Sequence, residues 1–160
     1  MSSLEEEIGE LLRQKKLTLG VVESATGGLI SHLITNVPGS SDYYRGAITA
    51  YSNEVKTRVA GVKESTIKQH GAVSYEVAEE MAEGGRKVLN VDICLADTGI
   101  AGPSGATPEK PVGLFYLGIA HSDGTSSEKH LFTGSRVQNK QTAARVALEW
   151  LKQHLLNLPD

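Results

Sequence analysis

Short strand-like segments alternate with helix-like segments along most of this chain, and this alternation is what most restricts its fold. Runs rich in β-branched residues predict strands at 17–22, 44–51, 91–97, 112–120 and 127–132. Between them, apolar residues recur every three or four positions, which predicts helices. The pattern favours an α/β fold of three layers, α/β/α, around a mixed, mostly parallel sheet.

Local signals refine this pattern. The last two strands meet at Asp123-Gly124, a pair typical of a hairpin turn, so they are expected to run antiparallel. The final helix should begin at Ser135, whose spacing to Gln138 matches a capping box. Gly84-Gly85 lies inside an expected helix, and because glycine weakens helices, we expect another element to pack closely there.

Size and composition set the broad class of protein. The 160 residues, 39% hydrophobic and 22% charged, predict one globular domain spanning residues 1–160. A net charge of -3 offers no electrostatic reason for direct nucleic-acid binding. No apolar run is long enough to span a membrane and no signal peptide is evident, so we expect a cytoplasmic protein. The single cysteine, Cys94, is expected to be a buried apolar residue.

Three segments place small polar residues and glycine at strand–helix junctions, where ligands bind in open α/β sheets. The first is Glu23–Gly28, whose helix start could hold a phosphate, although a helix cap explains the same residues. The third is Thr98–Gly105, which could supply backbone donors to an anion or be an ordinary loop. The five histidines show no metal-binding spacing, so the sequence predicts neither a metal nor a cofactor.

The second segment runs from Gly39 to Lys56 and contains the parts of a serine–lysine hydrolase. Serine is a weak nucleophile at neutral pH and needs a base. A lysine is a base only when uncharged, and burial favours that form. On spacing alone, a turn serine and a surface lysine explain Ser41 and Lys56 as well.

Taken together, six ordered segments resemble the CinA C-terminal domain family, the competence/damage-inducible family whose enzymatic members are nicotinamide-nucleotide amidases. The segments are Glu23–Gly28, Val37–Ser41, Ala50–Lys56, His70–Ser74, Thr98–Pro103 and Pro108–Gly113. Many members carry an additional N-terminal domain, and this chain resembles the stand-alone form. The resemblance implies hydrolysis of the carboxamide of nicotinamide mononucleotide to nicotinate mononucleotide and ammonia, in pyridine nucleotide recycling, without a metal.

The resemblance also implies a serine–lysine mechanism. Lys56 matches the family's lysine and Tyr51 its tyrosine, while Ser24 and Ser41 both match motif positions. We expect Ser41 to be the nucleophile, because its loop should face Lys56 across one strand, and Ser24 to orient the amide. The family usually has cysteine where this chain has Ala25, which excludes a thiol nucleophile there and favours serine.

The remaining expectations concern binding and assembly. The resemblance and the glycine-rich junctions together predict a set of substrate-binding residues: Thr26, Gly27, Gly28, Thr98, Gly99, Gly102 and Arg136. The expected partner is a small-molecule nucleotide, and α/β enzymes of this size often form homo-oligomers, dimers or higher. The alternative function is a non-catalytic nucleotide-binding domain, or a regulatory domain associated with competence or DNA damage. Retention of Lys56 and both serines favours the enzyme.

Overall fold

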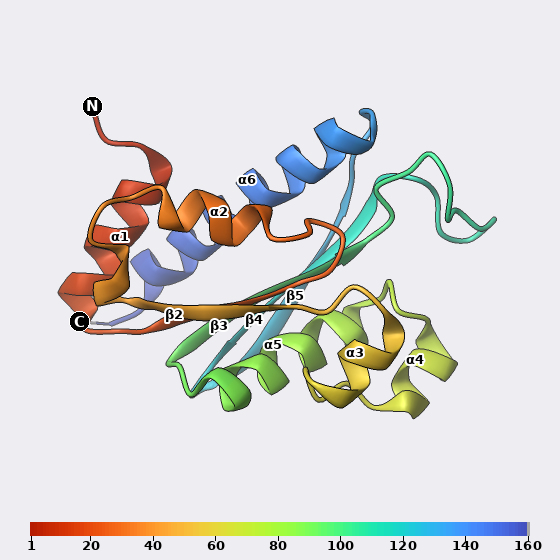
Figure 1. Ribbon diagram of the computed structural model, residues 1–160, viewed down its shortest axis with the longest axis horizontal. Coiled ribbons are helices and arrows are strands. Elements are labelled where there is room, and N and C mark those ends of the chain that lie inside the picture. Colours follow the sequence, from red (N-terminus) through yellow and green to blue (C-terminus); the bar gives the residue numbers. More distant parts are fainter. Residues whose placement is uncertain (160) are drawn as a thin grey trace.

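The computed structural model describes residues 1–159, and within them one five-stranded sheet lies between two helical layers (Figure 1). The strand order is β2-β1-β3-β4-β5. β1 pairs in parallel with β2 and β3, whereas β4 is antiparallel to β3 and β5. The sheet is therefore mixed, as predicted, with its pairings divided evenly between parallel and antiparallel rather than mostly parallel. The strands are β1 Leu19–Glu23, β2 Tyr44–Thr49, β3 Ile93–Gly99, β4 Leu114–His121 and β5 Gly124–Leu131.

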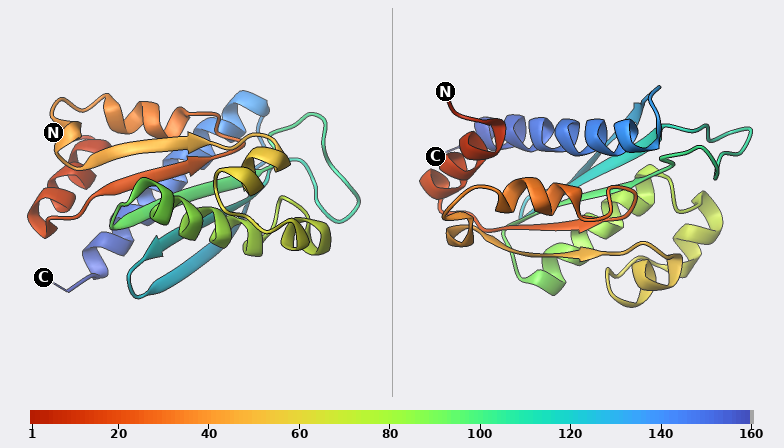
Figure 2. Two further views of the ribbon diagram at one scale, coloured as in Figure 1. Left: turned by 60° about the horizontal axis from the view of Figure 1, so that its bottom comes forward. Right: turned by 45° about the horizontal axis from the view of Figure 1, so that its top comes forward.

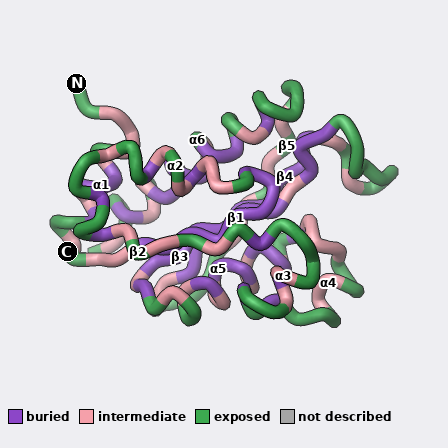
Figure 3. The backbone as a smooth tube through the Cα atoms, in the orientation of Figure 1, coloured by how far each residue is buried: buried purple, intermediate pink, exposed green. Residues whose placement is uncertain are grey.

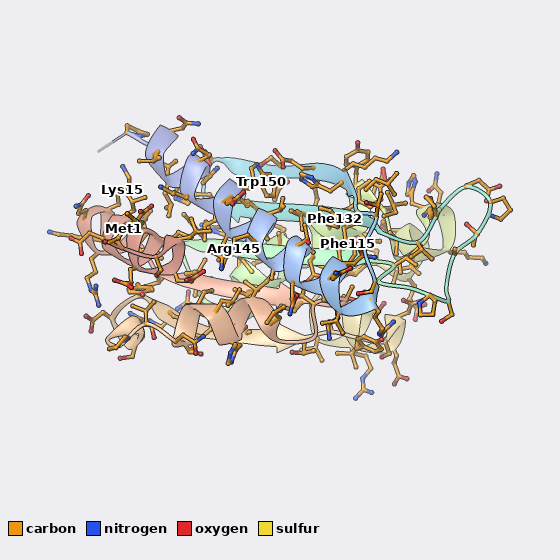
Figure 4. The ribbon with its side chains drawn as sticks, turned by 90° about the horizontal axis from the view of Figure 1, so that it is seen from above. Met1, Lys15, Phe115, Phe132, Arg145 and Trp150 are labelled. Carbon is orange, nitrogen blue, oxygen red and sulfur yellow. The ribbon has the colours of Figure 1, made fainter. Side chains whose placement is uncertain are left out.

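The helices divide between the two faces of the sheet (Figure 2). One layer holds α1 Leu4–Lys15, α2 Leu29–Thr35 and α6 Arg136–Asn157, and the other holds α3 Asn53–Arg58, α4 Glu64–His70 and α5 Tyr75–Leu89. Ser135 and Gln138 form the predicted capping box at the start of α6. Figure 4 looks down on α6, which an ion pair of 3.0 Å between Arg145 Nη1 and Glu5 Oε1 joins to α1.

Burial follows from the two-sided cover of the sheet. β1, β3 and β4 are buried along nearly their whole length (Figure 3), as expected for strands packed on both faces. On β1, Leu19 and Val21 pack into the core under α1, α2 and α6, while Val22 packs into the core under α5. Cys94 lies in the α5 core, and burial raises the pKa of its thiol to about 12. The thiol therefore stays uncharged, as predicted for a buried apolar residue.

The glycine pair in α5 confirms the expected close packing. A Cβ on Gly84 would stand 1.7 Å from the carbonyl oxygen of Ala60, and one on Gly85 would stand 2.2 Å from Val22 Cγ2. Glycine thus lets α5 approach both the sheet and the turn that follows α3. This contact fixes α3 against the body of the domain.

α1 and the end of α6 lie at the amino edge of the parallel strands, whereas α3, the start of α6 and the loop before β4 lie at the opposite edge (Figure 1). Of the helices in residues 1–159, none combines the length and apolar character needed to cross a bilayer.

Candidate active site

A cleft of about 300 Å³ opens at the carboxyl edge of the sheet. β1 and β3 are neighbours there, with Val22 opposite Ala96, so the residues that follow them meet at the cleft. The start of α3, the loop after β3 and the first residue of α6 complete its walls. The polar side chains that line it are Ser24, Tyr51, Asn53, Lys56, Thr98, Ser104 and Arg136.

Lys56 is buried in the short helix α3. The helix begins where the Ser52 hydroxyl accepts the Val55 N–H at 3.1 Å, and this cap turns Lys56 inward. The side chain is only 2% exposed, and its Nζ donates to the Tyr51 carbonyl oxygen at 3.1 Å. Burial lowers the pKa of Lys56, while the charge of Asp97 opposes that decrease. A lysine in these surroundings can serve as an uncharged base.

Ser24 lines the same cleft. It directly follows β1, is 6% exposed, and its backbone N–H donates to Asp97 Oδ2 at 3.2 Å. Thr98 follows from β3, and its hydroxyl donates to the Ala72 carbonyl oxygen at 2.8 Å. The cleft therefore brings a buried serine hydroxyl, a candidate nucleophile, together with a buried lysine, a candidate base.

Arg136 stands at the rim, where it is held by two hydrogen bonds. Its Nη1 donates to the Gly102 carbonyl oxygen at 2.7 Å and its Nη2 to the Tyr51 hydroxyl at 3.1 Å. A guanidinium has five N–H donors, so others stay available to an anionic ligand. Gly102 thus supports the arginine and does not line the cleft, whereas Gly99 does line it.

Ser41 does not meet Lys56, so the expected facing of these two residues is wrong. Ser41 lies exposed in the 3-10 turn η1 Ser40–Asp42, which precedes β2, while Lys56 follows β2. A strand carries the chain from one edge of a sheet to the other, and six residues span about 20 Å. Ser41 consequently lies at the amino edge, where its carbonyl oxygen accepts from Arg45 Nη1 at 3.0 Å.

The glycines of the first junction do not line the cleft that contains Lys56. Gly27 and Gly28 adopt left-handed conformations and line a separate shallow pocket with His32 and Lys140. Thr26 is 1% exposed, and its hydroxyl contacts two carboxyl groups. These residues therefore shape the turn beneath the cleft, and substrate bound beside Lys56 would not reach the Thr26 hydroxyl.

Two buried acids were missed from the sequence. Glu23 ends β1 and Asp97 lies in β3, both 0% exposed. Burial raises the pKa of Asp97 to about 6. An acidic residue within an apolar, fully buried strand was a signal available from the sequence, because such residues need specific partners. In residues 1–159, no three His, Cys, Asp or Glu side chains gather as ligands of a metal ion would.

Residues 1–155 match the CinA C-terminal domain family. The chain belongs to this family. A CinA-like protein of Thermotoga maritima is 46% identical over 152 residues, which are 95% of this chain and 37% of that protein. The chain spans 37–38% of the length of such curated CinA relatives.

Solved structures of CinA proteins share the fold. A competence-damaged protein (CinA) superfamily protein of Klebsiella pneumoniae matches with a TM-score of 0.94 at 26% identity, covering 97% of both chains. The competence/damage inducible protein CihA of Agrobacterium tumefaciens matches with a TM-score of 0.86 at 33% identity, covering 98% of this chain and 100% of that one. The CinA fold therefore extends over nearly the whole chain.

Proposed function

We propose that this chain hydrolyses the carboxamide of nicotinamide mononucleotide, giving nicotinate mononucleotide and ammonia, with Ser24 as nucleophile and Lys56 as base. The observation that carries the proposal is that a buried lysine with a lowered pKa lines the same cleft as Ser24. Similarity to the CinA family supplies the substrate, since its enzymatic members are nicotinamide-nucleotide amidases. The cleft supplies groups suited to the chemistry.

The reaction proceeds in two steps. The Ser24 oxygen attacks the carboxamide carbon while uncharged Lys56 accepts the hydroxyl proton. The tetrahedral intermediate collapses as the protonated lysine returns that proton to the departing nitrogen, which leaves as ammonia. Water then attacks the acyl-serine, with Lys56 accepting its proton and returning it to the Ser24 oxygen, and releases the nicotinate product.

The walls of the cleft suit the rest of the substrate. Ala101, Ser104 and Gly105 of the loop after β3 line the cleft, and backbone N–H groups there can donate to the negative oxygen of the intermediate. Arg136 also lines the cleft, and its guanidinium is suited to the phosphate of the mononucleotide. Tyr51 links Lys56 to Arg136, because its carbonyl accepts from Lys56 and its hydroxyl accepts from Arg136.

Four variants test the assignment by ammonia release, with folding followed by circular dichroism. Ser24→Ala and Lys56→Met should each lower kcat by at least about a thousandfold, and the double variant should be little worse, because the two groups act as a unit. Ser41→Ala is the matched control and should retain nearly full activity. An inactive Ser41→Ala beside an active Ser24→Ala would overturn the assignment. Wild-type protein that binds the mononucleotide without releasing ammonia would instead identify a nucleotide-binding domain.

A further inference from the structure

The Thr26 hydroxyl lies between two buried carboxyl groups directly beneath the cleft. Its Oγ1 is 2.7 Å from Glu23 Oε1 and also within hydrogen-bonding distance of Asp97 Oδ2. All three side chains are at most 1% exposed. A hydroxyl has one hydrogen and a carboxylate has none to donate, so Thr26 can satisfy only one of two ionised carboxylates. The arrangement therefore needs one further proton on Glu23 or Asp97.

The other hydrogen bonds decide which carboxyl carries that proton. Glu23 accepts from the backbone N–H groups of Gly28, Ile30 and Ser31, at 3.1, 2.9 and 2.9 Å, and from the Ser31 hydroxyl at 2.6 Å. This many donors stabilises an ionised carboxylate. Asp97 accepts only two backbone N–H groups besides Thr26, each at 3.2 Å. Glu23 is thus the ionised member of the pair.

We propose that Glu23 and Asp97 share one proton through Thr26, that this proton is bound to Asp97, and that Lys56 is thereby left as an uncharged amine. Asp97 donates to the Thr26 oxygen, and Thr26 donates to Glu23. Asp97 is then a positioning residue, since it also accepts the N–H of Ser24. The positioning role of Asp97 rests on the proposed function, whereas the location of the proton on Asp97 does not.

The electrostatics of the site favour this distribution. A donated hydrogen bond from Thr26 would lower the pKa of Asp97, yet burial still raises it to about 6. If Thr26 gives its hydrogen to Glu23 and accepts from Asp97, the same contact raises the pKa of Asp97 further. Burial also lowers the pKa of Lys56. A neutral carboxylic acid with a neutral amine has the same net charge as an ion pair and avoids burying two charges.

The charged groups around Asp97 come from three sides. β1 contributes Glu23, and α3 contributes Lys56, whose Nζ is hydrogen-bonded to the Tyr51 carbonyl. α6 contributes Arg136 at the cleft and Lys140, whose Nζ lies near Gly27. Arg136 is exposed and Lys140 is half-buried, so Lys56 is the buried amine among these groups.

The proton on Asp97 can be observed without any enzymatic activity. In the full chain labelled with ¹³C-carboxyl aspartate, NMR at pH 7.5 should show one protonated aspartic acid. Asp42, Asp92 and Asp123 are at least partly exposed, so among the described residues this signal belongs to Asp97. It should vanish in Asp97→Asn and persist in the control Asp92→Asn. A wild-type spectrum in which every aspartate is ionised would overturn the proposal, even if Asp97→Asn failed to fold.

The pH profile then tests the consequence for Lys56. Asn cannot ionise and can still donate to Thr26, although it loses the acceptor for the Ser24 N–H, so kcat should fall by up to about tenfold. The acidic limb of kcat/KM should stay within about 0.3 pH unit of wild type, because Lys56 faces a neutral partner in both proteins. If Asp97 were the ionised partner of a lysine ammonium, Asp97→Asn would move that limb at least about one unit to lower pH. Thr26→Val removes the hydroxyl between the two carboxyl groups and should lower kcat. Thr26→Ser keeps that hydroxyl and should restore kcat.

Discussion

Replacing Gly84 by alanine should destabilise the domain, although alanine is the better helix former. In an open helix, Gly→Ala gains about 1 kcal/mol of stability. Here the new Cβ would stand 1.7 Å from the Ala60 carbonyl oxygen and 2.7 Å from its carbonyl carbon, both backbone atoms that no side-chain rotation can move. α5 and the Ala60 turn must therefore separate.

The expected magnitude is the difference between two opposing effects. Overpacking of this kind costs about 1–3 kcal/mol, and the overlap with backbone places Gly84→Ala at the upper end. After the gain in helix propensity, the free energy of unfolding should fall by about 1–2 kcal/mol. The Val62 N–H donates to the Lys56 carbonyl oxygen at 3.0 Å, so displacement of the turn also displaces the lysine. Ammonia release should decrease as well.

Urea unfolding measures the change in stability, and ammonia release measures the change at the site. The matched control is Val88→Ala on the exposed face of the same helix, which improves helix propensity without meeting another element. It should leave stability equal or higher and activity unchanged. A Gly84→Ala variant as stable as Val88→Ala would refute the reasoning, because it would mean that the contact between α5 and the turn is not tight.

Three further predictions concern the cleft. Arg136→Ala should raise KM for nicotinamide mononucleotide at least about tenfold, because the variant removes the cation that binds the phosphate. KM for the riboside, which has no phosphate, should change little, and an equal increase for both substrates would argue against a phosphate role. Burial lowers the folded-state pKa of Lys56, so the unfolded chain binds more protons between the two pKa values and stability rises with pH across that window. Lys56→Met should abolish that rise and increase the melting temperature at neutral pH while removing activity, as calorimetry beside the ammonia assay would show. Activity should survive EDTA, and loss that a divalent ion restores would contradict the metal-free mechanism.

The strands, the capped helices and the glycine pair could be predicted because each depends on residues near in sequence. The placement of Ser41 could have been predicted from strand direction, because ligands bind at the carboxyl ends of the strands and Ser41 precedes its strand. Ser24 directly follows β1 and Thr98 lies at the carboxyl end of β3, so both reach the cleft, whereas Ser41 precedes β2 and does not.

The partners of Thr26 were harder to foresee, because Asp97 is 71 residues away and meets it only through the adjacency of β1 and β3. A threonine at a strand–helix junction looks the same in sequence whether its hydroxyl faces a substrate or a buried acid. The acids themselves, Glu23 and Asp97, were the informative residues, since carboxyl groups at the ends of buried strands need partners in the core.

α1 and the end of α6 lie at the edge of the sheet opposite the cleft (Figure 1). An affinity tag or surface linker joined next to either helix would therefore start from the edge that lies away from the cleft. Immobilisation through such a tag is expected to leave the cleft open to substrate.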